Sequence, residues 1–118
     1  MVIRFFRKDI YRNRAMMTAA VVDLFWKRAQ QENARFAPSA FVGMQLNRDI
    51  RYDLTTMPAP FLLVWGQFAA QTPFREAATV HALRPELPMV VLPSGDLPND
   101  ENPERFTDAL LRFVQQLD

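Results

Sequence analysis

The feature that most constrains the fold is a pair of short apolar runs in the second half of the chain. Residues 61–65 read FLLVW between a proline and a glycine, and residues 89–92 read MVVL between two prolines. Continuous apolar runs of this length, bounded by proline or glycine, are typical of β-strands that are buried on both faces. A helix is predicted between them over residues 73–83, with Pro73 in its first turn. Strand, helix and strand at these lengths predict a parallel βαβ unit.

A second helix is predicted after the second strand. Asn102 can cap it, Pro103 fits the first helical position, and Glu104 favours the positive end of the helix dipole. One apolar stripe then runs along the helix through Phe106, Leu110, Phe113, Val114 and Leu117. The predicted class is therefore α/β, with a βαβα unit that contains two parallel strands.

The first half of the chain has a helical pattern instead. Apolar residues recur at helical spacing across residues 15–31, and a second apolar helix is predicted over residues 38–46. Near the N-terminus, Ile3, Phe6 and Ile10 lie on one stripe of an amphipathic segment. We therefore divide the chain into a helical segment, residues 1–51, and a βαβα portion, residues 52–118.

Composition excludes several classes of function. The 118 residues include 49% apolar and 23% charged residues, which is typical of one globular domain. There is no cysteine and only one histidine, so thiolate metal sites and disulfides are excluded. No apolar run approaches the roughly 20 residues that cross a bilayer, and charges interrupt the N-terminus too often for a signal peptide. The expected location is cytoplasmic.

The net charge of +1 conceals two halves of opposite sign. Residues 1–51 carry ten Lys and Arg against four Asp and Glu, whereas residues 52–118 carry four against nine. A basic arm of this kind can bind nucleic acid or an anionic membrane surface, but it is more often a solvated helix face. We expect no nucleic-acid partner. Residues 1–14 are the candidate for membrane contact, although their stripe packs equally well on protein.

The C-terminal half also contains several short motifs that occur together in a known family. A strand reads PFLLVWG and is followed by TP; a later segment reads LPSGD, and the final helix is announced by ENPERF. In this order, these motifs resemble the C-terminal portion of the α/β-hydrolase fold. The resemblance covers about half of the chain, and it implies that residues 1–51 correspond to the helical lid that such proteins insert before these strands. The G-x-S-x-G nucleophile elbow and the oxyanion-hole segment of the family are absent from this sequence.

The resemblance also assigns two catalytic positions, and neither holds the family residue. The acid position, three residues after the glycine of the first strand, is Ala69, and the base position, after the glycine of the next loop, is Asp96. Histidine suits the base role because its pKa of about 6.5 allows proton transfer near neutral pH. A carboxylate with a pKa near 4 is a much poorer base for a hydroxyl group. We therefore predict no catalytic residue in this chain.

Other candidate residues have simpler structural explanations. His81 lies inside the predicted helix between the strands, where a lone histidine is usually structural. Asp96, Asp100 and Glu101 have no calcium-loop spacing, and the last two suit the positive end of the final helix. The three glycines form no phosphate-binding loop. We predict no metal site and no cofactor.

Three functional interpretations follow. Two parallel strands are marginal alone in water, so the sheet edge is expected to pair with a protein partner or with a second copy of the chain. The first interpretation is accordingly a truncated pseudoenzyme that acts as an interaction module or subunit. The second is the C-terminal half of a serine-type hydrolase of ester or related bonds, completed by a partner chain. The third is a gene fragment without an independent role.

Overall fold

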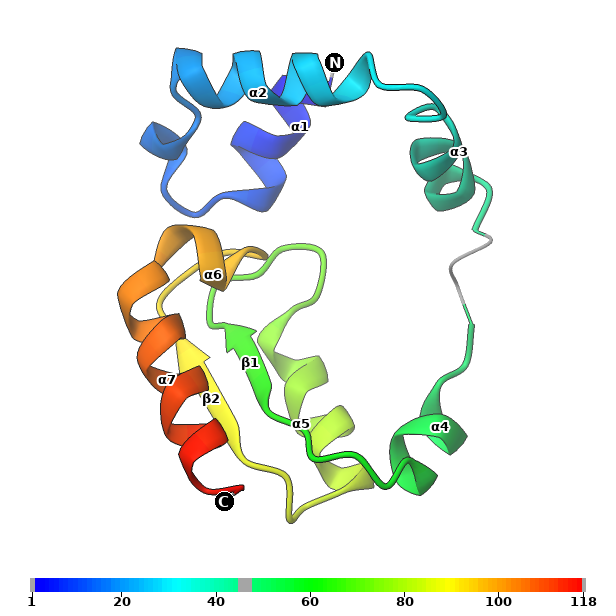
Figure 1. The fold of residues 1–118 in the computed structure, drawn as a ribbon, viewed down its shortest axis with the longest axis vertical. Coiled ribbons are helices and arrows are strands. Elements are labelled where there is room, and N and C mark those ends of the chain that lie inside the picture. Colours follow the sequence, from blue (N-terminus) through cyan, green and yellow to red (C-terminus); the bar gives the residue numbers. More distant parts are fainter. Residues whose placement is uncertain (1, 45–47, 118) are drawn as a thin grey trace.

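A computed structural model describes residues 2–44 and 48–117 of the chain. The first part contains only helices, and the second part contains two strands among helices (Figure 1). In chain order the elements are α1 (Val2–Phe5), the π-helical turn η1 (Phe6–Ile10), the 3-10 turn η2 (Arg14–Met16), α2 (Ala19–Ala29), α3 (Phe36–Val42), α4 (Arg51–Thr56), β1 (Leu63–Gly66), α5 (Phe74–Leu83), β2 (Met89–Leu92), α6 (Pro98–Glu101) and α7 (Pro103–Gln115).

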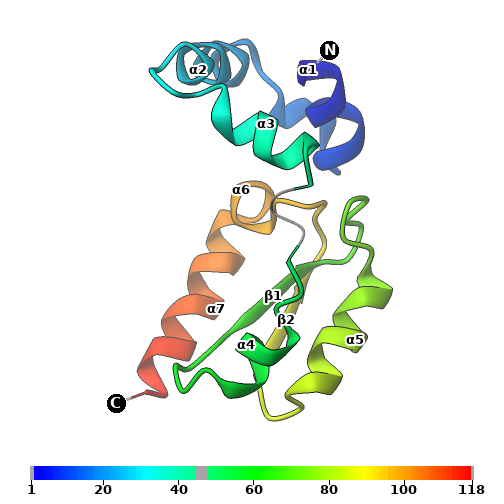
Figure 2. The same cartoon turned by 90° about the vertical axis from the view of Figure 1, so that its right-hand side faces the viewer.

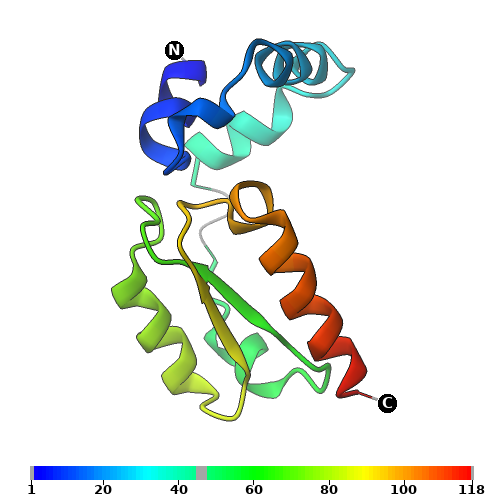
Figure 3. The same ribbon diagram turned by 90° about the vertical axis from the view of Figure 1, so that its left-hand side faces the viewer.

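The second part forms the predicted βαβα unit. Strands β1 and β2 pair in parallel, with Leu63 opposite Met89 and Gly66 opposite Leu92. Helix α5 lies on one side of the strands and α7 on the other (Figures 2 and 3). The α/β class and the parallel pairing are confirmed, because the strand β2 and the helices α5 and α7 occupy the residues that the apolar pattern indicates.

Three element boundaries differ from the sequence prediction. Strand β1 begins at Leu63 rather than at residue 61, because pairing starts where the Leu63 N–H donates to the Pro88 carbonyl (3.0 Å). Helix α2 begins at Ala19 rather than at residue 15, because the Thr18 side chain caps it by accepting from the Val21 N–H (3.3 Å). Helix α3 covers residues 36–42, and part of the predicted helix 38–46 falls outside the described residues.

The short helices α4 and α6 were not predicted, and α4 crosses the boundary at residues 51 and 52. It depends on a tertiary contact: the Arg84 guanidinium donates to the carbonyls of Leu54 (3.3 Å) and Met57 (3.1 Å). The predicted Asn102 cap is also wrong in detail. Asn102 precedes α7, but its side chain makes no capping hydrogen bond and instead donates to the Pro93 carbonyl (3.5 Å).

Burial is sparse in the described residues. Ala77 and Leu87 are buried beside the strands, as is Leu92 in β2. In contrast, Leu63, Val64 and Trp65 are only half-buried, so the prediction of a strand buried on both faces is not met. The physical reason is that each strand has one neighbouring strand in the described part of the chain.

The low burial agrees with an open overall shape. The radius of gyration of the Cα atoms is 16.2 Å, whereas a compact domain of this length has one of about 13.5 Å. Figure 1 shows the N-terminal helices beyond the carboxyl ends of the strands, with α4 at the opposite end. No helix of residues 2–44 or 48–117 combines the length and the apolar character that a membrane span needs.

Two neighbouring alanines of α5 test this packing. Ala77 is fully buried, whereas Ala78 is exposed. We expect Ala77→Leu to lower the free energy of unfolding by about 1–3 kcal/mol, because the larger side chain must displace well-packed neighbours. Ala78→Leu serves as the control and should change it by less than about 0.5 kcal/mol. Equal effects of the two substitutions in urea unfolding would contradict the placement of α5.

Candidate functional site

The candidate site lies where the two strands end. Because β1 and β2 are parallel, their carboxyl ends meet at the same edge, and the loops that follow them lie together. These loops are residues 67–73, after β1, and residues 93–97, after β2. The Phe68 N–H joins the two loops by donating to the Ser94 carbonyl (2.9 Å), and the Gln67 N–H donates to the carbonyl of Leu92, the last residue of β2 (2.8 Å).

The Asp96 carboxylate connects the two loops most extensively. It accepts hydrogen bonds from the N–H groups of Ala70 (2.9 Å), Gln71 (3.1 and 3.2 Å) and Thr72 (3.1 Å). It also accepts from the Thr72 hydroxyl group (3.2 Å). An ionised carboxylate offers about four lone-pair sites, so these donors use its capacity almost completely. The side chain therefore fixes the loop of residues 67–73 in place.

Two glycines allow the loops to approach this closely. A Cβ atom on Gly66 would lie 1.8 Å from the Gly95 carbonyl oxygen, and a Cβ atom on Gly95 would lie 2.2 Å from the Ile10 carbonyl oxygen. Both obstacles are backbone atoms, which cannot move aside as a flexible side chain can. Glycine is thus required at both positions for the loops and the N-terminal segment to meet.

The structure brings the two positions that the resemblance assigned into the same small region. Ala69 is 8% exposed, and its methyl group offers no acid that could orient a base. Asp96 reaches the backbone directly after Ala69, at the Ala70 N–H. Both oxygens of its carboxylate accept hydrogen bonds from backbone amides of the loop after β1. These contacts join the loop after β1 to the loop after β2.

The N-terminal segment of residues 10–13 is anchored to the same place. The Asp96 N–H donates to the Ile10 carbonyl (3.0 Å), and the Tyr11 hydroxyl group donates to the Asp100 carboxylate. Glu101 joins both parts, because one of its oxygens accepts from the Gly95 N–H (2.7 Å) and the other from the Asn13 N–H (2.7 Å). These bonds attach the helical first part to the βαβα unit.

Tyr11 is the most strongly perturbed titratable group of this contact. It is 4% exposed. Burial raises the pKa of its hydroxyl group well above the usual value, and the hydrogen bond to Asp100 and the charges of Asp100 and Glu101 raise it further. The neutral form is therefore the one that the fold stabilises.

The remaining candidates have structural roles, and two of them differ from the prediction. Asp100 and Glu101 belong to α6 and bind residues 11–13, rather than serving mainly the positive end of the final helix. His81 lies in α5, where its Nε2 atom is 2.9 Å from the Leu87 carbonyl oxygen. Among residues 2–44 and 48–117, no group of three or more His, Cys, Asp or Glu residues is arranged to hold a metal ion.

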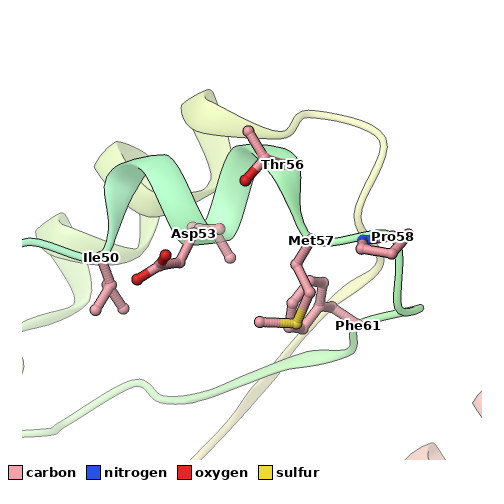
Figure 4. Close-up of a pocket in the computed structure, with 7 residues that line it drawn as sticks. Ile50, Asp53, Thr56, Met57, Pro58 and Phe61 are labelled. Carbon is pink, nitrogen blue, oxygen red and sulfur yellow. The ribbon is translucent and has the colours of Figure 1, made fainter.

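A separate cavity of about 510 Å³ lies at the amino ends of the strands (Figure 4). Its lining is mainly apolar, and Asp53 supplies its only ionisable side chain, which pairs with Arg48 at 3.0 Å. The lining residues are Ile50, Asp53, Leu54, Thr56, Met57, Pro58 and Phe61. This cavity lies away from the loops described above.

The comparisons with known proteins agree with this architecture. No family model and no curated protein matches the chain. Among solved structures, the crystal structure of E-2-(acetamidomethylene)succinate hydrolase is similar, with a TM-score of 0.57 and 27% sequence identity. The chain has a partial α/β-hydrolase fold. The similarity covers 59% of this chain but only 26% of that hydrolase, so this partial α/β-hydrolase fold spans about a quarter of the length of the enzyme.

Sequence reasoning did not find Tyr11, Asn13 or Glu101 as partners. The hydrogen bond from the Asn13 N–H joins residues 88 positions apart, and the one from Tyr11 joins residues 89 positions apart. Nothing in a local pattern indicates such a pair. The available signal was the ENPERF motif of residues 101–106, which resembles the family. It contains Glu101 but does not indicate what the Glu101 carboxylate binds.

The role of Asp96 can be tested by its removal. Asp96→Ala leaves three backbone N–H groups and a hydroxyl group without their acceptor, and we expect the free energy of unfolding to fall by about 1.5–3 kcal/mol. Asp108→Ala is a matched control, because Asp108 forms only an exposed pair with Arg112, and it should cost less than about 0.5 kcal/mol. A loss for Asp96→Ala as small as that of the control would show that the carboxylate does not hold the loop.

Tyr11 predicts a specific pH dependence. Its pKa is raised in the folded state, so its stabilising effect is fully present below the unfolded value of about 10 and is lost as the pH rises above it. We expect Tyr11→Phe to lower stability by about 1–2 kcal/mol at neutral pH. The variant should also lose less stability than the wild type above pH 10. Parallel stability curves from urea unfolding between pH 7 and 11 would contradict the Tyr11–Asp100 contact.

Proposed function

We propose that this partial α/β-hydrolase fold is a non-catalytic interaction module that binds another protein chain through apolar surface of its βαβα unit. The observation that carries the proposal is the apolar stripe of α7. Phe106 and Phe113 are half-buried against the unit, but Leu110 is 43% and Val114 is 47% exposed. Leu111 widens the exposed flank further. Part of the apolar surface of α7 is therefore left exposed, because the described residues do not cover it.

The strands support the same proposal. Val91 of β2 is 38% exposed, and the residues of β1 are half-buried. A parallel strand is normally covered on both faces and flanked by neighbouring strands, because its edge carries unpaired N–H and C=O groups. A second protein surface with apolar side chains would cover both the edge and the flank of α7.

The contacts of Asp96 favour a non-catalytic role. Hydrolysis in the manner of a Ser-His-Asp triad needs an imidazole that an acid orients. Here the assigned acid position is an alanine, and the assigned base position is a carboxylate already bound to loop amides. We therefore do not extend to this chain the hydrolase activity named for the similar structure.

The proposal is tested with a double substitution on the exposed flank of α7. Leu110→Glu with Val114→Glu places two charges on the surface that should be buried in the complex, so we expect loss of the partner with the fold retained. Thr107→Glu with Gln115→Glu adds the same charge to exposed polar positions of the same helix and is the matched control. The measurement is affinity purification of each tagged full chain from its native cells, with quantitative mass spectrometry. Sedimentation of each purified chain detects self-association.

The proposal is supported if the control still binds a partner protein or a second copy of the chain, and the Leu110 and Val114 double variant does not. Identical recovery by all three proteins would contradict the proposed surface. A partner that carries a serine nucleophile, together with ester turnover by the complex, would contradict the non-catalytic role and favour a hydrolase that two chains complete.

A further inference from the structure

The N-terminal segment contains a cavity whose lining residues, within the described part of the chain, are all basic. It has a volume of about 190 Å³ and is lined by Arg4 from α1, Arg7 and Lys8 from η1, and Arg14 from η2. Arg4, Arg7 and Lys8 belong to consecutive helical turns, and all three line the cavity. The Asn13 side chain accepts from the Ala15 N–H (3.1 Å) and thereby caps the turn that carries Arg14. Residues from three successive elements therefore line the same cavity, and all four are cations.

These cations have no acidic partner in the described part of the chain. The ion pairs there involve Lys27, Arg48, Arg51, Arg75, Arg84 and Arg112, and none of them includes a residue of the cavity. A neighbouring cavity of about 170 Å³ shares Lys8 and Arg14 and adds Arg12 and Asp9. Among the described residues, the two cavities are therefore lined by five cationic side chains and one carboxylate. Like charges at helical spacing repel one another, so a bound anion would relieve this repulsion.

The apolar side of the same segment packs against other aromatic side chains of the protein. The rings of Phe6 and Phe25 pack with their centroids 4.7 Å apart, and Phe5 meets Phe6 edge to face at 5.8 Å. Phe5, at the end of α1, and Phe6, at the start of η1, are thus half-buried against protein. A membrane-binding segment would instead need these rings free to enter the lipid. The concave, basic side favours a compact ligand that enters between the side chains.

We propose that Arg4, Arg7, Lys8 and Arg14 form a binding site for a compact anion that bears phosphate groups. Guanidinium groups bind phosphate oxygens through paired N–H donors, and several cations around one concavity reinforce each other's field. A volume of about 190 Å³ is below that of sites for drug-sized ligands and suits one or two phosphate groups. This site is independent of the interaction surface on α7, and its failure would leave that proposal unchanged.

The test is a titration of the full chain with inorganic pyrophosphate by isothermal calorimetry. We expect saturable binding with one site, and an affinity at least about tenfold lower for Arg4→Gln with Arg7→Gln, because two paired donors are lost. Arg28→Gln with Arg105→Gln removes the same charge from exposed positions elsewhere and is the matched control. Its affinity should stay within about threefold of the wild type. Arg14→Gln, on a separate turn, tests the site again if the double variant misfolds.

Three results would overturn the proposal. The first is no saturable binding of pyrophosphate by the wild type at concentrations up to about 10 mM. The second is an equal loss of affinity in the control, which would indicate an effect of net charge alone. The third comes from vesicles that contain a phosphorylated inositol lipid: binding to these vesicles without binding of soluble pyrophosphate would make the segment a membrane-contact surface. If the wild type binds both pyrophosphate and the vesicles, and the Arg4→Gln, Arg7→Gln variant binds neither, the site is supported. A lipid headgroup is then one source of the phosphate.

Discussion

The arrangement of the loops depends on the carboxylate of Asp96. This carboxylate accepts hydrogen bonds from three consecutive N–H groups of the loop after β1, and the backbone N–H of Asp96 donates to the Ile10 carbonyl. Asp96 therefore joins three parts of the chain that are far apart in the sequence. Gly66 and Gly95 make the junction sterically possible, and Glu101 adds a second link to the N-terminal segment. Without these contacts, the loops would be joined by the two four-residue strands and by the backbone hydrogen bonds of Gln67 and Phe68.

The same interaction explains how a loop without an acid or an imidazole keeps a defined conformation. In a hydrolase triad, a histidine and an acid at such strand ends bind each other. Here the Asp96 carboxylate binds the backbone of the opposite loop instead. The Asp96 carboxylate thus connects the two strand ends of the partial α/β-hydrolase fold, with alanine at the assigned acid position and aspartate at the assigned base position. This supports the proposed non-catalytic role.

Much of the βαβα unit could be predicted from local sequence, for identifiable physical reasons. The run at residues 89–92 lies between two prolines, and the final helix has a proline at its first position and a long apolar stripe. Helix α4 could not be found in this way. Its six residues include two threonines, which are weak helix formers, and its carbonyls are held by Arg84 from a distant part of the chain. The anchoring of residues 10–13 likewise joins residues that only the folded structure brings together. Full burial of β1 was predicted from an apolar run, but burial depends on neighbours that the run itself does not specify.

The most direct test of this account is amide hydrogen exchange of the loop after β1 in the unmodified chain, followed residue by residue by NMR. We expect the N–H groups of Ala70, Gln71 and Thr72 to exchange slowly, because each donates to the Asp96 carboxylate. All three residues are exposed, so solvent access alone would leave these amides unprotected. Exchange of the three amides at the rate of an unstructured peptide would contradict the central role of Asp96.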